Sequence, residues 1–303
     1  MSEPIPVILN AAAGKGYRPE DIQQLAELFR AAGAEVRIFL ARRGSRVARL
    51  ARRVMQRQPE VIVAGGGDGT VSSVAAEVVS TGTALGILPL GTLNHFAKDV
   101  GIPLELPDAV RTIAARRVHR VDVGEVNDRI FINNSSLGLY PYIVRHRELL
   151  RRRLGAGKWA AAVWATLTVM RRRPFLTVEL RVDDEQRSYR TPLVFIGNNA
   201  YVIEGFNLGR RERLDAGILD VYVIRRPSRL ALLSLAVRAL FGRLQQAEDF
   251  ESHMTQSVEV ATRRQRVPVA IDGEVRTLET PLQYRIRAGE LRVIVPGEAG
   301  AGT

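Results

Sequence analysis

The residues of this chain best suited to chemistry form a glycine-rich loop around one carboxylate. An apolar run that ends at Ala64 leads directly into Gly65, Gly66, Gly67, Asp68, Gly69 and Thr70. Glycines let the backbone approach a ligand closely, so successive N–H groups can point at phosphoryl oxygens. A helix predicted over residues 71–80 would present its N-terminus to the same anion. The loop favours phosphate binding, with a plain tight turn after the strand as the alternative.

The spacing of these glycines is that of neither a P-loop nor a dinucleotide-binding turn, so another kind of nucleotide site is indicated. Two further polar segments, residues 10–15 and 89–94, also follow predicted strands. The strands that should position all three segments are expected at residues 5–9, 35–40, 60–64 and 85–88, with helices at 19–32, 45–58 and 71–80. This alternation predicts a parallel sheet, whose carboxyl edge is where ligands bind.

From about residue 118 the pattern changes to short strands separated by turn residues. They are expected at residues 120–126, 129–134, 176–182, 192–197, 218–225, 258–261 and 267–271, with a final pair around residues 288–290. The prediction is an α/β nucleotide-binding domain over residues 1–120 and a β-sandwich-like lipid-substrate domain over residues 121–303, with the last strand returning to the first domain. A cleft between the two domains is expected.

Composition narrows the class of protein. The 303 residues are 46% hydrophobic and include no cysteine, which excludes a disulfide scaffold and thiolate metal sites. The chain starts without a basic region leading into a long apolar segment, and the apolar stretch 159–170 is too short to span a bilayer, so a cytoplasmic protein is expected. The net charge of +12 favours polyanionic partners, but no nucleic-acid-binding motif is present.

Two arginine-bearing stretches, residues 145–173 and 229–244, have the composition of amphipathic helices. They either pack their apolar sides on their own domain or enter a membrane interface, where arginine pairs with anionic lipid. The arginines at 151–153 and 171–173 are the expected contacts to an anionic surface.

Five short motifs make the whole chain resemble the bacterial diacylglycerol kinase-like lipid kinases. They occupy residues 10–14, 65–70, 88–94, 122–124 and 272–274. The glycine motif is shared with a superfamily that includes NAD kinases, sphingosine kinases and phosphofructokinases, whereas the motifs at 88–94 and 272–274 favour the lipid-kinase branch. The resemblance implies a nucleotide-binding α/β domain followed by a β-sandwich, with ATP and Mg²⁺ as cofactors.

The resemblance also implies roles for individual residues. ATP would be bound by Asn10, Thr92, Asn94 and the loop from Gly65 through Gly66, Gly67, Asp68 and Gly69 to Thr70. Asp68 would help to place Mg²⁺ on the phosphates, and Glu274 would be the general base, with Asp122 as a further acidic site position. Taken alone, Glu274 follows a turn signal, and the sequence without the resemblance favours an exposed hairpin glutamate over a base.

The chain departs from the family pattern at three places. His95 replaces an aspartate, Ser72 and Ser73 replace an Asn-Glu pair, and Ala216 replaces the second carboxylate of a magnesium loop in which only Asp215 remains. These changes bear on the metal arrangement and the lipid headgroup. His95 is read as a hydrogen-bonding substitute or as a further catalytic residue.

The function expected from these observations is ATP-dependent phosphorylation of a free hydroxyl on a membrane lipid, diacylglycerol by default, in phospholipid metabolism. The enzyme would act peripherally on the inner face of the membrane, through an anionic surface and without nucleic acid, and a homodimer is left open. The alternatives are a kinase for a sphingoid base or for a soluble acceptor such as NAD, and a homologue that binds nucleotide and membrane without turnover.

Overall fold

The computed structural model describes residues 3–11, 18–139, 141, 175–182, 185–204, 207–211, 213–224 and 250–297. The chain divides into two compact units, one made of Met1–Val123 with Ala288–Thr303 and the other of Gly124–Arg287. The two predicted amphipathic stretches, including the arginines at 151–153 and 171–173, lie outside the described residues, as do residues 12–15 of the first polar segment.

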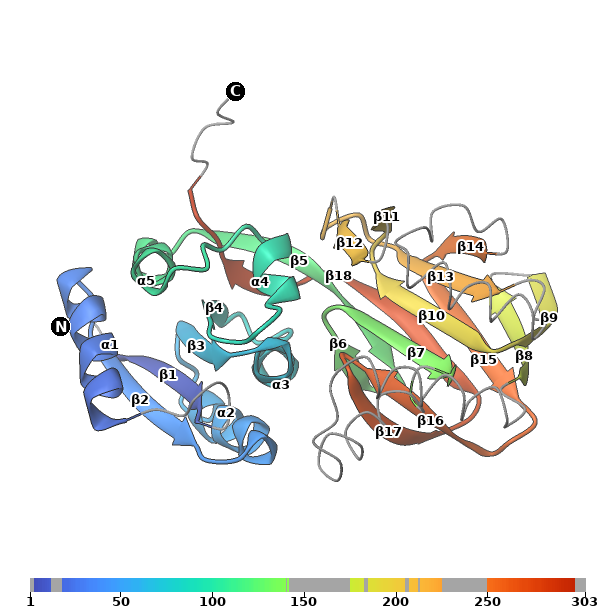
Figure 1. Cartoon of the computed structure of the whole chain (residues 1–303), viewed down its shortest axis with the longest axis horizontal. Helices are drawn as coiled ribbons and strands as arrows, with labels where there is room; N and C mark the ends of the chain where they lie inside the picture. Colours follow the sequence, from blue (N-terminus) through green and yellow to red (C-terminus); the bar gives the residue numbers. More distant parts are fainter. Residues whose placement is uncertain are drawn as a thin grey trace, which may run out of the picture. The chain divides into compact units, whose positions relative to one another are not determined.

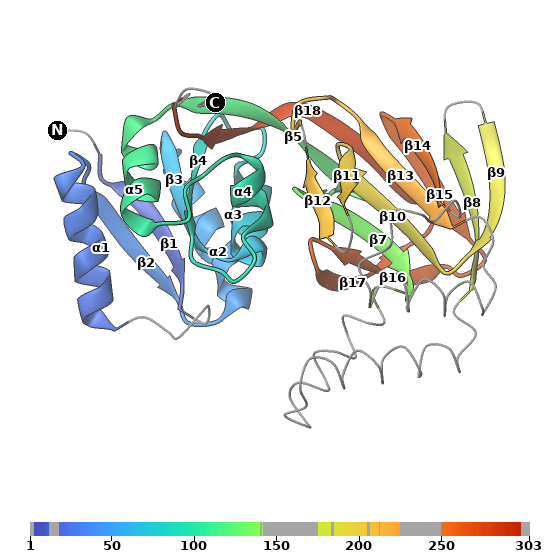
Figure 2. The ribbon, with the colours of Figure 1, turned by 45° about the horizontal axis from the view of Figure 1, so that its top comes forward.

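The first unit is a parallel sheet with helices on both faces, as the alternating pattern predicts (Figure 1). Its elements are β1 (Ile5–Asn10), α1 (Pro19–Ala31), β2 (Val36–Ala41), η1 (Gly44–Arg46), α2 (Val47–Met55), β3 (Val61–Gly66), α3 (Asp68–Val78), β4 (Ala84–Pro89), α4 (His95–Asp99), α5 (Leu106–Ala115) and β5 (Val118–Val126). The strand order β2-β1-β3-β4 is completed by the end of β18 (Leu282–Ile294). Helices α1 and α5 pack together, and α2 packs with α3 (Figure 2).

Helix α3 begins earlier than the sequence analysis predicts. It starts at Asp68 rather than at residue 71, because the carbonyl of Gly67 accepts hydrogen bonds from the N–H groups of Thr70 (2.8 Å) and Val71 (3.1 Å). The Asp-Gly-Thr segment is therefore the first helical turn, and the glycine loop before it is short. This geometry brings the helix N-terminus close to the end of β3.

The predicted strand pair near residue 289 is wrong, since β18 is one continuous strand of 13 residues. Gly289 adopts a positive φ of 61° and donates its N–H to the Asp122 carboxylate at 2.8 Å, which accommodates the irregularity without a turn. The strand pairs antiparallel with β15 (Ser257–Thr262) in the second unit and parallel with β4 in the first.

The second unit consists of antiparallel sheets that bury their apolar faces in a common core, which agrees with the predicted β-sandwich. Its remaining strands are β6 (Arg129–Phe131), β7 (Asn134–Gly138), β8 (Leu176–Val182), β9 (Glu185–Thr191), β10 (Leu193–Asn198), β11 (Tyr201–Glu204), β12 (Asn207–Arg211), β13 (Leu219–Ile224), β14 (Phe250–Thr255), β16 (Arg266–Ile271) and β17 (Glu274–Glu279). One sheet has the order β14-β13-β10-β7-β16-β17, and the facing strands include β18, β15, β8 and β9.

The core of this sandwich is made of alternate residues from both sheets. Tyr284 is completely buried, packs edge-on against Phe131 with ring centroids 6.3 Å apart, and shares a 3.0 Å hydrogen bond with the Ser135 hydroxyl. Burial raises the pKa of this phenol well above its usual value. Among the described helices, none combines the length and the apolar composition required to cross a bilayer.

Candidate active site

Two loops at the carboxyl ends of β3 and β4 pack backbone against backbone. The N–H of Leu90 donates to the carbonyl of Gly66 at 3.1 Å. A Cβ built on Gly91 would lie 2.3 Å from the Cα of Gly67, and a Cβ on Gly66 would lie 2.4 Å from the Thr70 hydroxyl oxygen. Gly65 is equally confined, with Leu9 at 2.2 Å from the corresponding position. Glycine at position 91 therefore allows the two loops to touch, whereas Gly65 and Gly66 leave room for the side chains of Leu9 and Thr70.

Gly69 has a different environment. It is exposed, and among the described residues no atom outside its chain neighbours and the backbone of its own helix lies within 4 Å of the position that a Cβ would occupy. This open space lies at the first turn of α3, where N–H groups of the helix lack intrahelical partners. An anion such as a nucleotide phosphate fits a helix N-terminus approached through a glycine.

The end of β1 is tied to this helix turn. Asn10 donates from its side-chain amide to the hydroxyl of Thr70 at 3.0 Å. The ideal Cβ of Gly44, in the turn after β2, is 3.9 Å from the same amide nitrogen. The carboxyl edge of the sheet therefore unites Asn10 with the glycine loop, although 60 positions separate Asn10 from Thr70 in the chain.

Asp68 connects the glycine loop to the next polar loop. Its Oδ1 accepts a hydrogen bond from the backbone N–H of Phe96 at 3.1 Å, at the start of α4. Mg²⁺ in phosphoryl-transfer sites is commonly held by one or two carboxylates together with phosphate oxygens and water. Asp68 offers such a carboxylate beside the helix N-terminus, so the residues present fit a nucleotide-bound Mg²⁺.

The side chain of Asn94 holds the loop from Pro89 to Asn94 together through hydrogen bonds to the backbone of that loop. The Asn94 side chain accepts from the N–H of Gly91 and donates to the carbonyls of Pro89 and Gly91, each at 3.0 Å. Asn94 is buried and adopts a left-handed conformation with φ 51°. Thr92 and His95 flank it on the exposed side of the loop. Asn94 thus shapes the loop, while Thr92 and His95 are accessible to a ligand.

Asp122 is buried in β5, and its Oδ1 accepts the Gly289 N–H. Its described role is to anchor the irregular point of β18.

In the second unit, Glu274 is the first residue of β17, directly after a tight turn. Asp272 and Gly273 form this turn with φ angles of 46° and 82°, and Ile271 pairs with Glu274 across it. Positive φ at both central residues is typical of the two-residue hairpin turns that asparagine or aspartate followed by glycine prefers. The Glu274 carboxylate is 56% exposed and forms a 3.0 Å ion pair with Arg276.

The structural role of Asp272 is not predicted by the sequence. Its carboxylate accepts three backbone N–H groups, from Ile132 (2.9 Å), Asn133 (2.8 Å) and Asn134 (3.1 Å). Charge-assisted hydrogen bonds of this kind fix the turn that carries Glu274 onto the segment before β7. An Asp-Gly pair predicts a turn, but nothing in the sequence indicates which distant amides its carboxylate binds.

Arg211 holds the same segment from another direction and was also missed. It is buried, and its guanidinium donates to the carbonyls of Ile132 (2.6 Å) and Asn198 (3.1 Å) and to the side-chain oxygen of Asn133 (2.9 Å). The guanidinium also lies over the ring of Tyr201, 5.4 Å from its centroid. Arg211 and Asp272 together make this corner of the sandwich rigid.

Asp215, the predicted second metal ligand, belongs to the second unit and forms a 3.0 Å ion pair with Arg213. The neighbouring Ala216 donates its N–H to the Asn199 side chain at 3.2 Å. Asp68 belongs to the first unit, and the described residues contain no group of three or more histidine, cysteine, aspartate or glutamate side chains suited to a metal. The assignment of Asp215 to a metal stays a prediction.

Two protein families match this chain in succession. The Diacylglycerol kinase catalytic domain matches residues 4–126, and the YegS C-terminal NAD kinase beta sandwich-like domain matches residues 136–295. A protein of Chromohalobacter salexigens named "Probable lipid kinase YegS-like" is 29% identical over 273 residues, which cover 88% of this chain and 86% of the relative.

A protein of the same name from Pseudomonas syringae pv. syringae is 30% identical over 293 residues, covering 94% of this chain and 92% of the relative. The crystal structure of a diacylglycerol kinase from Bacillus anthracis str. Sterne has the same fold, with a TM-score of 0.71 at 21% identity and coverage of 98% of both chains. The two domains and the near full-length relatives show that the chain belongs to the family of diacylglycerol kinase and YegS-like lipid kinases.

Proposed function

We propose that this protein is an ATP-dependent kinase that transfers the γ-phosphoryl group of ATP to a free hydroxyl of a membrane lipid, with diacylglycerol as the first candidate. The observation that carries the proposal is the packed pair of loops after β3 and β4, which leaves open space at Gly69 beside a helix N-terminus and a carboxylate. In a lipid-kinase family, this arrangement has the features of a triphosphate site.

Different residues of the first unit would bind different parts of the nucleotide. Backbone N–H groups from Gly67 to Gly69 would bind phosphate oxygens, and Asn10 would hold the Thr70 side chain in position. Asp68 would hold Mg²⁺, which when bound neutralises charge on the transferred group. Thr92 and His95, on the exposed side of the second loop, would contact the nucleotide or the acceptor.

Glu274 is proposed as the general base that takes the proton of the lipid hydroxyl. Two observations support this role: the side chain is exposed, and its turn is fixed by the three hydrogen bonds to Asp272. A base must be held within hydrogen-bond reach of the proton that it abstracts, and a rigid hairpin can do so better than a mobile loop. Asp122 and His95 remain the next candidates.

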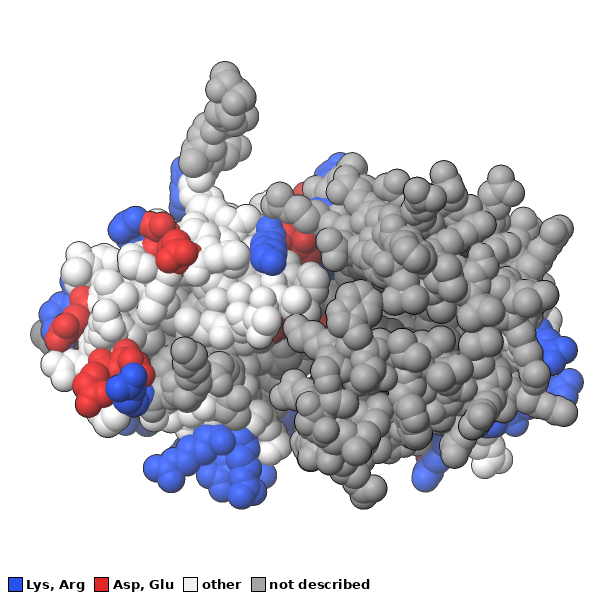
Figure 3. Space-filling view, in the orientation of Figure 1, with Lys and Arg blue, Asp and Glu red and all other residues white. Residues whose placement is uncertain are grey.

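The proposed site of action is an anionic membrane surface on the cytoplasmic side. The net charge of +12 supports this, because basic proteins are attracted to anionic headgroups over about a Debye length. The described part of the chain adds exposed arginines along the β2–α2 segment, and Figure 3 shows basic side chains gathered over α2.

The test is incubation of the purified protein with labelled ATP, Mg²⁺ and a total lipid extract, followed by identification of the labelled product. We expect a phosphorylated lipid, and Glu274→Gln should prevent its formation while ATP still binds. A labelled soluble product such as NADP would contradict the lipid acceptor in favour of the soluble one. Nucleotide binding without any transfer would contradict the kinase assignment and favour a non-catalytic homologue.

A further inference from the structure

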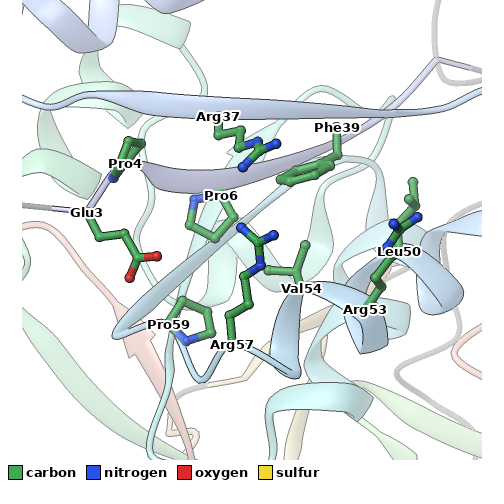
Figure 4. A pocket seen from close by; sticks show the side chains of 10 residues that line it. All are labelled: Glu3, Pro4, Pro6, Arg37, Phe39, Leu50, Arg53, Val54, Arg57 and Pro59. Carbon is green, nitrogen blue, oxygen red and sulfur yellow. The ribbon is translucent and has the colours of Figure 1, made fainter.

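A second pocket lies in the first unit, away from the glycine loop. It has a volume of about 270 Å³ and lies between the amino-terminal part of β1, the strand β2 and the second half of α2 (Figure 4). The nucleotide loops follow the carboxyl ends of β3 and β4, whereas this pocket reaches the amino-terminal side of the same sheet through Glu3 and Pro59. The two sites therefore use different edges of the sheet.

Three arginines line this pocket, and Glu3 contributes the only carboxylate among its described lining residues. Figure 4 shows Arg37 extending from β2 and Arg57 from beyond the end of α2 toward the middle of the pocket, with Arg53 at one side. Three positive charges and one negative charge leave a formal excess of two positive charges.

Three other arginines of this unit, Arg52, Arg111 and Arg116, have carboxylate partners among the described residues. Among the described residues, none of the three pocket arginines forms an ion pair, whereas the adjacent Arg52 pairs with Glu77 at 2.7 Å. Like charges brought together on one surface repel each other, and this repulsion is relieved when an anion binds between them. The lining is thus electrostatically suited to a dianion.

The remaining walls of the pocket are apolar, and one aromatic ring in them stacks against an arginine. Phe39 and Val54 contribute to these walls, and the guanidinium of Arg37 lies over the Phe39 ring, 5.6 Å from its centroid. A guanidinium stacked on a ring keeps its in-plane N–H donors available for an oxyanion. The pocket therefore combines a preoriented donor with an apolar surface for a small organic group.

We infer that this pocket is a binding site for a phosphomonoester, separate from the nucleotide site. A phosphomonoester carries between one and a half and two negative charges at neutral pH, which matches the excess charge, and arginine binds its oxygens in pairs. The volume is near the lower limit of ordinary ligand sites, so it suits a phosphate with a small substituent rather than a whole nucleotide. The ligand is either the headgroup of a phosphomonoester lipid or a soluble phosphate ester. This inference does not rest on the proposed kinase activity.

The first experiment is calorimetric titration of the full-length protein with glycerol 3-phosphate at constant ionic strength. We expect the double variant Arg37→Gln/Arg57→Gln to bind about tenfold more weakly than the parent, whereas Arg30→Gln, which removes one positive charge at an exposed position of α1, should bind within about twofold. Phosphate held at the glycine loop would survive in the double variant, so the difference between variants isolates the pocket. Thermal unfolding of each variant checks that the fold is retained.

The second experiment identifies the source of the phosphomonoester. Vesicles of phosphatidylcholine containing phosphatidic acid are compared with vesicles containing phosphatidylglycerol, a phosphodiester, at equal surface charge. A lipid source predicts stronger sedimentation with phosphatidic acid that is lost in the double variant and kept in Arg30→Gln. A soluble source predicts the glycerol 3-phosphate result with no such preference among vesicles. Binding that is absent from both arms, or that is equal in the parent and the double variant, overturns the inference.

Discussion

Replacing Gly69 by alanine should weaken ATP binding without harming the fold. Apart from its chain neighbours and the backbone of its own helix, no atom of the described residues lies within 4 Å of the new methyl group, and Gly69 is part of the first turn of α3 with no positive φ to strain. Alanine in a helix is more stable than glycine by about 0.5–1 kcal/mol, so the free energy of unfolding should stay equal or rise slightly. The methyl group would occupy the space through which a phosphate approaches, and we expect the Kd for ATP to increase at least about tenfold, or about 1.4 kcal/mol.

Gly91→Ala is the matched variant in which stability should fall. Its Cβ would lie 2.3 Å from the Cα of Gly67 and 2.7 Å from the Asn94 side-chain oxygen. The first contact is with backbone, which cannot rotate away, so the two loops must separate. Overpacking of this kind costs about 1–3 kcal/mol. Both variants should lose ATP affinity, but only Gly91→Ala should unfold at a lower urea concentration.

The assay is urea unfolding followed by circular dichroism, together with calorimetric titration of ATP in the presence of Mg²⁺. If Gly69→Ala binds ATP as tightly as the parent, the phosphates do not approach along α3, and the proposed nucleotide site is wrong. If Gly91→Ala is as stable as the parent, the contact between the two loops is not the reason for glycine at this position.

Three further predictions concern the second unit. Glu274→Gln should lower kcat by about 10² to 10⁴-fold with an unchanged Kd for ATP, whereas Glu279→Gln at the other end of β17 should leave kcat unaltered; equal rates for parent and Glu274→Gln would place the base elsewhere. Asp272→Ala removes the acceptor of three backbone N–H groups and should lower the free energy of unfolding by about 2 kcal/mol, measured in urea; no loss would show that water replaces the carboxylate. Burial raises the pKa of Asp220 above its ordinary 3.8, so the folded state binds this proton more tightly than the unfolded state does. The resulting contribution to the free energy of unfolding is present below pH 3.8 and is lost as the pH rises through the raised pKa. The stability of the parent relative to Asp220→Asn should therefore decrease as the pH rises above 3.8, and a difference independent of pH would contradict this.

Local patterns in the sequence predicted the α/β unit well, because each of its elements is specified by nearby residues. Apolar runs of strand length end in polar loops, and Pro19 and Gly33 mark the two ends of α1. The glycine loop was recognisable since strand, glycines and helix are consecutive in the chain. The boundaries were less accurate: α3 begins at Asp68, because the Gly67 carbonyl already accepts the first helical hydrogen bonds. Helix α5 was not predicted.

The β-rich unit was predicted as a class but not in detail. Alternating residues indicated strands, yet partner choice depends on contacts between residues far apart in the chain. Strand β7 pairs with β10 and β16, and β18 pairs with β4 about 200 positions earlier. Such long-range pairing follows from the packing of whole sheets, which no short window of sequence contains.

The sequence by itself determined the kinds of residue at the site and the family in which they occur: glycines and an aspartate after one strand, a second loop after the next, and a glutamate after a turn. Only the tertiary structure decided which of these residues touch. It showed that Gly91 lies against Gly67, that Asn94 serves its own loop, and that Asp272 fixes the Glu274 turn. It also brought Arg37 and Arg57 to one pocket, although 20 positions separate them. The physical reason is that a side chain's chemistry is local, whereas its partners are chosen by the packing of the sheets and helices that carry them.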